Sequence, residues 1–139
     1  MTTRYFSRQW TIHFSHCDPA GIVFFPQYLV LFNNLVETWF TEGLGISYAD
    51  MIAQRRVGLP TVHLECDFRR ISRMGEQLDF CVAVKRLGSR SLTLQLWVGE
   101  QDQPRVRLSG RRWRPWHDAL HGAPRPSATG HRSATRAGQ

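Results

Sequence analysis

Hydrophobic and polar side chains alternate along several short runs between residues 61 and 110, and this period of two is typical of strands with one covered face. The three clearest runs are residues 61–68, 78–85 and 91–98, and a shorter one follows at 105–110. Turn residues separate the runs, so they predict an antiparallel meander. A further short strand is expected near the N-terminus, at residues 8–14, where three apolar side chains share a face: Trp10, Ile12 and Phe14.

A period of three to four residues replaces the alternation between the first strand and the meander. Apolar residues follow it over 28–40, which predicts a helix over 26–42 that is roughly 25 Å long. The apolar stripe is wider than on a surface helix, which indicates a helix that a curled sheet covers on several sides. Pro26 suits the first turn of this helix. Ser47 is expected to cap a second, shorter helix that runs through about Arg55.

Residues 22–40 are apolar enough to be compared with a membrane span. The stretch contains Glu37 and the adjacent pair Asn33 and Asn34, which are costly in hydrocarbon, and Pro26 stands where the helix should begin. We therefore interpret it as the buried helix of a globular domain.

Cysteine usage and the N-terminus set expectations about compartment and metals. The chain has three cysteines, an odd number without a C-x-x-C pair, which argues against a disulfide framework and against a zinc site. The first residues lack the continuous apolar run of a signal peptide. We therefore expect a cytoplasmic protein without a metal site.

The net charge of +7 is concentrated at one end of the chain. Residues 1–103 are neutral overall, whereas residues 104–139 carry eight arginines and a single acidic residue, Asp118. The composition after Arg111 is rich in Arg, Pro, Ala, Ser and Gly without apolar periodicity. The pattern predicts a folded domain over 1–116 and a disordered or loosely attached tail over 117–139.

The segment between the first strand and the long helix carries the candidate chemistry. Pro19 disfavours helical geometry at Asp18, and Gly21 lets the chain reverse toward the helix. The Asp18 carboxylate is therefore expected just ahead of a helix N-terminus, where free N–H groups and the helix dipole favour an ionised nucleophile or base. The free amide near Phe25 is suited to polarising a carbonyl, so the pair suits acyl transfer. The alternative is that Asp18 only stabilises the turn.

This segment, HCDPAGIVFFPQY over residues 16–28, resembles the active-site segment of the 4-hydroxybenzoyl-CoA thioesterase family. The resemblance extends from about residue 8 to 108 and includes GLPTVHLECDFRR, GEQLDF and KRLGSRSL. It implies an α+β hotdog fold, in which an antiparallel sheet wraps around a long central helix. It also implies an acyl-CoA thioesterase that needs no cofactor, since coenzyme A is part of the substrate.

The resemblance assigns roles to individual positions. Asp18 matches the catalytic aspartate, as nucleophile or as general base, and the backbone N–H of Phe25 matches the donor to the thioester carbonyl. His16 stands where relatives often have an acidic residue, so it either modulates Asp18 or is an ordinary surface residue. Family members are homodimers or homotetramers with each active site at a dimer interface. The remaining expected contacts are Gly21, Pro26, Tyr28 and His63 for the acyl part of the substrate, and Lys85, Arg86 and Arg90 for the CoA phosphates.

Several alternatives stay open at this stage. Phe24, Phe25 and Tyr28 are compatible with an aromatic acyl group such as benzoyl or hydroxybenzoyl, but short or medium aliphatic groups fit as well. A hotdog hydratase or dehydratase is a second hypothesis, although the central helix lacks a His-plus-acid motif. A third is a non-catalytic module that binds acyl-CoA or, through the basic tail, nucleic acid or another anion. Cys17 has no obvious base partner as a nucleophile. Trp97, on the outward strand face, is expected to serve subunit contact.

Overall fold

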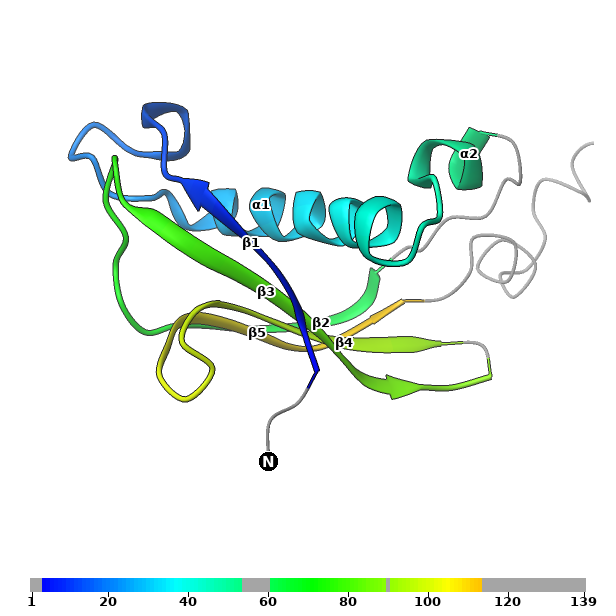
Figure 1. Cartoon of the computed structure of the whole chain (residues 1–139). Coiled ribbons are helices and arrows are strands. Elements are labelled where there is room, and N and C mark those ends of the chain that lie inside the picture. Colours follow the sequence, from blue (N-terminus) through cyan, green and yellow to red (C-terminus); the bar gives the residue numbers. More distant parts are fainter. Residues whose placement is uncertain (1–3, 54–60, 90, 114–139) are drawn as a thin grey trace, which may run out of the picture.

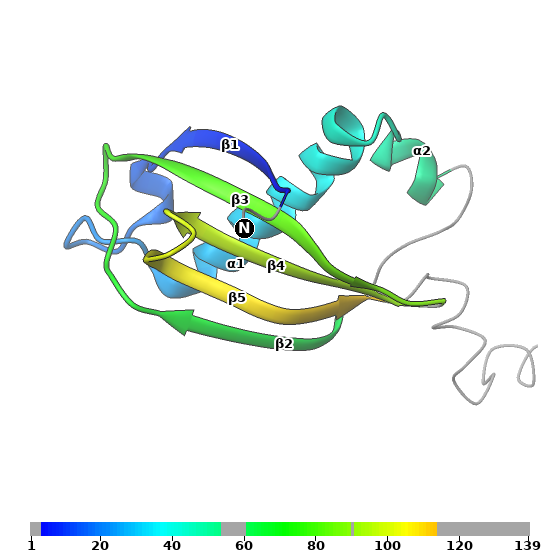
Figure 2. The ribbon, with the colours of Figure 1, turned by 60° about the horizontal axis from the view of Figure 1, so that its bottom comes forward.

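One long helix lies across one face of a curved antiparallel sheet (Figure 1). The structure is a computed structural model, and it describes residues 4–53, 61–89 and 91–113. The strands pair in the order β1-β3-β4-β5-β2, so β1 and β2 form the two edges (Figure 2). In chain order the elements are β1 (Phe6–Thr11), a 3-10 turn (Phe14–His16), α1 (Phe25–Thr38), a π turn (Trp39–Gly43), α2 (Tyr48–Ala53), β2 (Thr61–Phe68), β3 (Gln77–Leu87), β4 (Leu92–Gly99) and β5 (Pro104–Trp113).

The hydrophobic core fills the space between α1 and the inner face of the sheet. The predicted alternation is confirmed over most of β3 and β4, whose inward side chains from Leu78 to Val82 and from Leu94 to Val98 are almost fully buried, whereas Val84, which the pattern also predicts to be covered, is 42% exposed. Burial of this many large apolar side chains is the main force that holds the helix against the sheet. The buried contributors are Leu31, Phe32, Leu35 and Val36 from α1, Leu78, Phe80 and Val82 from β3, and Leu94, Leu96 and Val98 from β4.

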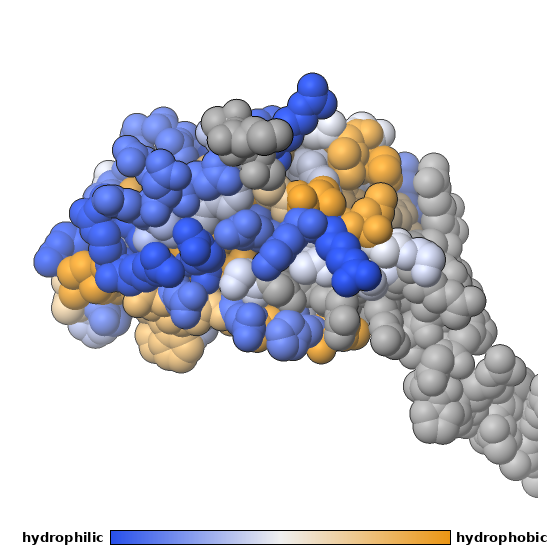
Figure 3. Space-filling model, turned by 90° about the horizontal axis from the view of Figure 1, so that it is seen from below, coloured by the Kyte–Doolittle hydropathy of each residue, from blue (hydrophilic) through white to orange (hydrophobic). Residues whose placement is uncertain are grey.

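The sheet face turned away from α1 is mostly hydrophilic (Figure 3). Trp97 lies on this face but is only 2% exposed, because the ring of Tyr5 packs edge-on against it at 5.3 Å between centroids. Cys81 and Ala83 are buried beside it. The expectation that Trp97 serves subunit contact is wrong, since a residue of the same chain covers it.

Edge strand β2 departs from the predicted pattern of burial. Its alternating apolar side chains were expected to be covered, yet Val62, Leu64 and Phe68 are 44%, 40% and 47% exposed. The strand pairs only with β5 among the described elements, and α1 packs mainly against the central strands. Apolar and polar side chains do alternate along β2, but α1 is too narrow to cover the whole sheet, so the apolar side chains of this edge strand stay exposed.

Element ends differ from the predictions in several places, and β3 and β5 run on to Leu87 and Trp113. The first strand ends at Thr11, and Phe14 lies in the 3-10 turn with its ring exposed, because the chain turns away from the sheet after Ile12. The long helix begins in the predicted place, with Pro26 in its first turn, and its last residues form the π turn. The N–H of Asp50 donates to Ser47 Oγ at 3.2 Å, as expected of the cap of α2. The predicted end of that helix at Arg55 lies outside the described residues.

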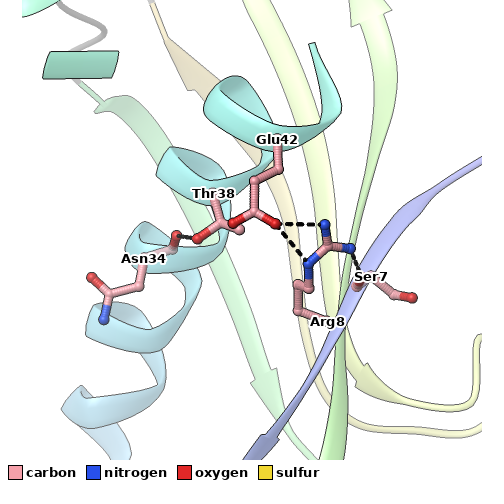
Figure 4. A network of polar contacts seen from close by, with 5 residues as sticks. All are labelled: Ser7, Arg8, Asn34, Thr38 and Glu42. Carbon is pink, nitrogen blue, oxygen red and sulfur yellow. Dashed lines mark hydrogen bonds and ion pairs between the residues drawn. The ribbon is translucent and has the colours of Figure 1, made fainter. Parts of the chain in front are cut away.

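An ion pair ties β1 to the far end of the helix (Figure 4). Arg8 donates to Glu42 Oε1 from Nη2 at 2.8 Å and from Nε at 3.3 Å. Its Nη1 donates to the carbonyl of Ser7 at 2.8 Å. Both charged side chains are well exposed, so water screens the pair and its contribution to stability is about 1 kcal/mol or less.

Among the helices that the structure describes, none combines the length and the apolar character that crossing a bilayer would require.

Candidate active site

Asp18 is held by a tight loop that its own carboxylate closes. Asp18 Oδ1 accepts the backbone N–H of Ala20 at 2.9 Å and that of Ile22 at 3.3 Å. The backbone completes the loop, since Asp18 N–H donates to the Ile22 carbonyl and Gly21 N–H donates to the Asp18 carbonyl, both at 2.9 Å. Gly21 has φ of +78°, which side-chain-bearing residues rarely adopt. Both bonds fall on Oδ1, and no hydrogen bond to Oδ2 is made by the residues that the structure describes.

The same loop leads directly into the N-terminus of α1. Cys17 pairs with Val23 in an antiparallel bridge, and Phe24 N–H donates to the His16 carbonyl at 3.0 Å. Phe25 is the first residue of α1, so its N–H has no carbonyl within the helix to bind. The helix dipole adds partial positive charge at this point. The loop thus brings the Asp18 carboxylate and the Phe25 N–H to the same end of the helix. Asp18 also stabilises the turn, as the alternative interpretation predicted.

An apolar pocket of about 200 Å³ opens beside the helix N-terminus. The Phe68 ring forms one wall, with its centroid 5.7 Å from that of Phe25 and 5.9 Å from that of Tyr28. Such a pocket suits a flat apolar group better than a charged one. Its lining residues are Val23, Phe25, Tyr28, Phe68, Arg69, Arg70 and Ile71.

The structure brings some predicted site residues together and leaves others apart. Gly21 and Pro26 join Asp18 in the loop and first helical turn, and Tyr28 lines the pocket. His63 is exposed on β2, toward the end of that strand opposite Phe68, and does not line this pocket. Lys85 and Arg86 are exposed near the far end of β3, and Arg90 and the tail over 117–139 lie outside the described residues. The proposed roles of all these residues stay predictions.

Sequence reasoning missed the pocket wall formed by Phe68, Arg69, Arg70 and Ile71. These residues end β2 and begin the connection to β3, far in sequence from the Asp18 loop. In the sequence, the run FRRI at the end of an alternating segment indicates where the strand ends. It does not indicate which part of the protein these residues contact.

Cys17 is poorly suited to be the nucleophile. Partial burial and the neighbouring Asp18 carboxylate raise the pKa of its thiol, which favours the unreactive protonated form at neutral pH. Among the described residues, no three His, Cys, Asp or Glu side chains gather in a way that could hold a metal ion.

His16 has a structural position in the loop. Its Nδ1 accepts the backbone N–H of His13 at 3.0 Å and so closes the 3-10 turn that precedes Asp18. Burial lowers the pKa of His16, and the charge of His13 lowers it further, so the neutral ring that can accept this bond is favoured.

Tyr28 and Ser72 place two buried hydroxyl groups behind the pocket. Within the part of the chain that the structure describes, neither Tyr28 Oη nor Ser72 Oγ has a hydrogen-bond partner of good geometry. The two groups are neighbours, and burial raises the pKa of Tyr28 while the Ser72 hydroxyl partly offsets the rise. A buried hydroxyl without a partner reduces stability.

Comparison with known proteins shows the family of this chain. The sequence profile of the thioesterase-like superfamily matches residues 12–112, so the chain belongs to this superfamily. A 1,4-dihydroxy-2-naphthoyl-CoA hydrolase of Picosynechococcus is 30% identical over 96 residues, which cover 68% of this chain. The matched stretch spans 65% of that relative's own length.

Solved structures support the fold. A 1,4-dihydroxy-2-naphthoyl-CoA thioesterase from Synechocystis superposes with a TM-score of 0.70 at 20% identity, covering 81% of this chain and 82% of the other. A 4-hydroxybenzoyl CoA thioesterase mutant complexed with 4-hydroxybenzoyl CoA gives 0.71 at 20% identity, covering 81% and 84%. The expected hotdog fold is thereby confirmed.

We expect His16→Asn to remove a pH-dependent part of stability. The asparagine Oδ1 takes the place of Nδ1 as an acceptor but does not titrate. Because the folded-state pKa of His16 lies below its ordinary value near 6.5, the neutral ring stabilises the fold fully above that pH and loses its effect as the pH falls. The free energy of unfolding, measured in urea between about pH 7 and pH 5, should fall more for the wild type than for the variant. His63→Asn is the control, and parallel curves for His16→Asn and the wild type would contradict the prediction.

Tyr28→Phe is expected to leave the free energy of unfolding unchanged or to raise it by about 1 kcal/mol. The substitution keeps the ring in the core and removes a buried hydroxyl that has no partner in the described part of the chain. Urea unfolding measures the change, with Tyr5→Phe at an exposed ring as the control. A loss of more than about 1 kcal/mol would show that the hydroxyl has a partner in solution.

Proposed function

We propose that this protein hydrolyses an acyl-CoA thioester to the free acid and coenzyme A. The observation that carries the proposal is the loop in which Asp18 Oδ1 is fixed by two backbone N–H groups while Oδ2 accepts no hydrogen bond from the described residues, directly before the N-terminus of α1. Membership in the thioesterase-like superfamily and the activities for which the relatives are named support it.

In the proposed reaction, Phe25 and Asp18 have different roles. The thioester carbonyl oxygen accepts the Phe25 N–H, and the helix dipole stabilises the negative charge that develops there. Asp18 Oδ2 then attacks the carbonyl carbon, or it takes a proton from a water molecule that attacks instead. In the first route the C–S bond breaks to leave an anhydride between Asp18 and the acyl group, and water then hydrolyses this anhydride to release the free acid and restore the Asp18 carboxylate. In the second route the attacking water adds directly to the carbonyl carbon before the C–S bond breaks. In both routes water supplies the oxygen of the free acid, and coenzyme A leaves as its thiol with a proton that comes from that water. Both roles of Asp18 fit the same loop.

An aromatic acyl group is the proposed substrate class. The rings of Phe25, Phe68 and Tyr28 bound the pocket, and edge-on contacts between these rings leave flat apolar surface toward a ligand. The relatives are named for naphthoyl and benzoyl thioesters, which are aromatic. An aliphatic acyl group remains the alternative, and a panel of both kinds of CoA thioester, assayed for released thiol, separates them. Formation of a double bond without thiol release would support a hydratase or dehydratase instead.

A second copy of the chain is the proposed partner that completes the site. The pocket of about 200 Å³ is smaller than the roughly 300–1,000 Å³ typical of small-molecule sites, as expected if one chain builds only part of it. Among the described strands, β2 has a neighbour on one side only, and it carries the exposed apolar side chains Val62, Leu64 and Phe68. Edges of this kind pair readily with another strand.

Two-fold pairing of β2 with its copy would also bring the distant basic residues to the site. Residues Thr61 and Leu87 lie at one end of the sheet, whereas Phe68 and Phe80 lie at the other. Lys85 is about 26 Å from Gln77 along β3, at roughly 3.3 Å per residue. Because two-fold edge pairing is antiparallel, the basic end of one copy and the pocket end of the other lie on the same side. The second copy then supplies His63, Lys85 and Arg86.

Asp18→Asn is expected to lower kcat by about 100-fold or more while leaving the fold intact. The amide oxygen of asparagine still accepts the N–H groups of Ala20 and Ile22, so the loop keeps its shape. Thiol release from the best CoA thioester measures kcat, and circular dichroism checks the fold. Asp79→Asn, at an exposed position of β3, is the matched control. A variant as fast as the wild type would show that Asp18 has no part in the reaction.

Leu64→Lys is expected to convert a dimer into a monomer and to reduce kcat/KM by about 10-fold or more. The change places a charge on the exposed apolar face of the free edge. Analytical ultracentrifugation measures the mass in solution. Val84→Lys provides the control, since Val84 is equally exposed but lies on β3, away from the edge. A monomeric wild type with full activity would contradict the proposal.

A further inference from the structure

Among the described residues, one residue of β5, Arg105, makes all the hydrogen bonds and ion pairs between that strand and the β2–β3 connection, residues 69–76. The Arg105 carbonyl accepts the N–H of Arg69 at 2.8 Å and that of Arg70 at 2.9 Å. Its Nη1 donates to the Ile71 carbonyl at 3.3 Å and pairs with Glu76 Oε2 at 2.9 Å. Both ends of the connection are thus held by the same arginine.

Glu76 uses its other oxygen to close the turn. Oε1 accepts the N–H of Arg73 at 2.7 Å, and Glu76 N–H donates to the Arg73 carbonyl at 3.2 Å. Gly75, with φ of +91°, permits the reversal. The carboxylate therefore links the side chain of Arg105 to the backbone of the turn.

This turn also holds the loop that carries Asp18. Val23 N–H donates to the Ser72 carbonyl at 2.9 Å, and Met74 N–H donates to the Gly21 carbonyl at 2.9 Å. On the other side of the loop, Ile12 exchanges two bonds of 2.8 Å with the turn, one to the Glu76 carbonyl and one from Gly75 N–H. The turn is therefore hydrogen-bonded to the chain both before and after Asp18.

The Glu76–Arg105 pair is also close to the pocket. The connection that it orders supplies the lining residues Arg69, Arg70 and Ile71. The charges of both partners also act on the buried phenol of Tyr28. The Glu76 and Arg105 side chains are only 33% and 21% exposed, so water screens this pair less than the Arg8–Glu42 pair, whose side chains are 39% and 55% exposed.

We propose that the ion pair between Glu76 and Arg105 positions the Asp18 loop against the start of α1, so that both are positioning residues for the reaction. The kinetic part rests on the proposed thioesterase function. The structural part does not, because it concerns only the order of the loop.

The kinetic test uses Glu76→Gln, which removes the charge but keeps an oxygen for the Arg73 N–H. We expect kcat to fall by about 10- to 100-fold, with KM changing much less, because a small misplacement of the reacting carboxylate slows the chemical step. Arg105→Lys should retain most of kcat, whereas Arg105→Met should lose as much as Glu76→Gln. Glu42→Gln breaks the exposed ion pair of equal length and should leave kcat within about twofold of the wild type.

Hydrogen exchange at single amides tests the same inference without relying on activity. In Glu76→Gln the N–H groups of Gly21, Ile22 and Val23 should exchange faster than in the wild type, and in Glu42→Gln they should not. Unchanged exchange in the loop, or a kcat that stays at the level of Glu42→Gln while the melting temperature falls, would overturn the proposal. A wild type that releases no thiol from any CoA thioester would refute the proposed function alone, and the exchange rates would still decide the role of the ion pair.

Discussion

Packing of one helix into the concave face of a single sheet is the constraint on which the site depends. The side chains of Phe32 and Leu35 are fully buried against the central strands, so α1 can neither slide nor rotate without opening the core. Its N-terminus is therefore fixed in space. A helix start carries free N–H groups whether or not they are used. The loop that holds the Asp18 carboxylate leads directly into this helix start.

The parts of the fold that local pattern decides were predictable. Alternation in β3 and β4 and the period of α1 follow from which side chains must face the core, and Ser47 caps α2 as its residue type suggests. Whether an apolar face is covered depends instead on where other elements end. Leu64 alternates correctly but lies beyond the reach of the helix, and Trp97 is buried because the N-terminal segment happens to return over it.

The candidate site also has a part that was predictable from local sequence and a part that was not. Asp18, Gly21 and Phe25 lie within eight consecutive residues, so proline and glycine geometry and the helix start relate them directly. Phe68 and the pocket wall reach the site only through the pairing of β2 with β5. A pattern within a few consecutive residues cannot predict a contact between segments that are far apart in the sequence. His16 illustrates a different limit, since its role depends on one backbone N–H that its ring accepts, and the residue type alone does not disclose this.

Two ion pairs of nearly equal length show why contact geometry alone does not rank interactions. Arg8–Glu42 at 2.8 Å and Arg105–Glu76 at 2.9 Å each join a strand to a neighbouring segment. In the first, Arg8 is the one donor to the carboxylate among the described residues, and the segments are already joined by the core. In the second, the carboxylate also accepts a backbone N–H of the turn, and that turn binds the loop on both sides of Asp18. The effect of an ion pair on local structure therefore depends on which backbone segment it holds in place. A short connection that buries few side chains of its own depends on such a pair more than a helix that is packed in the core does.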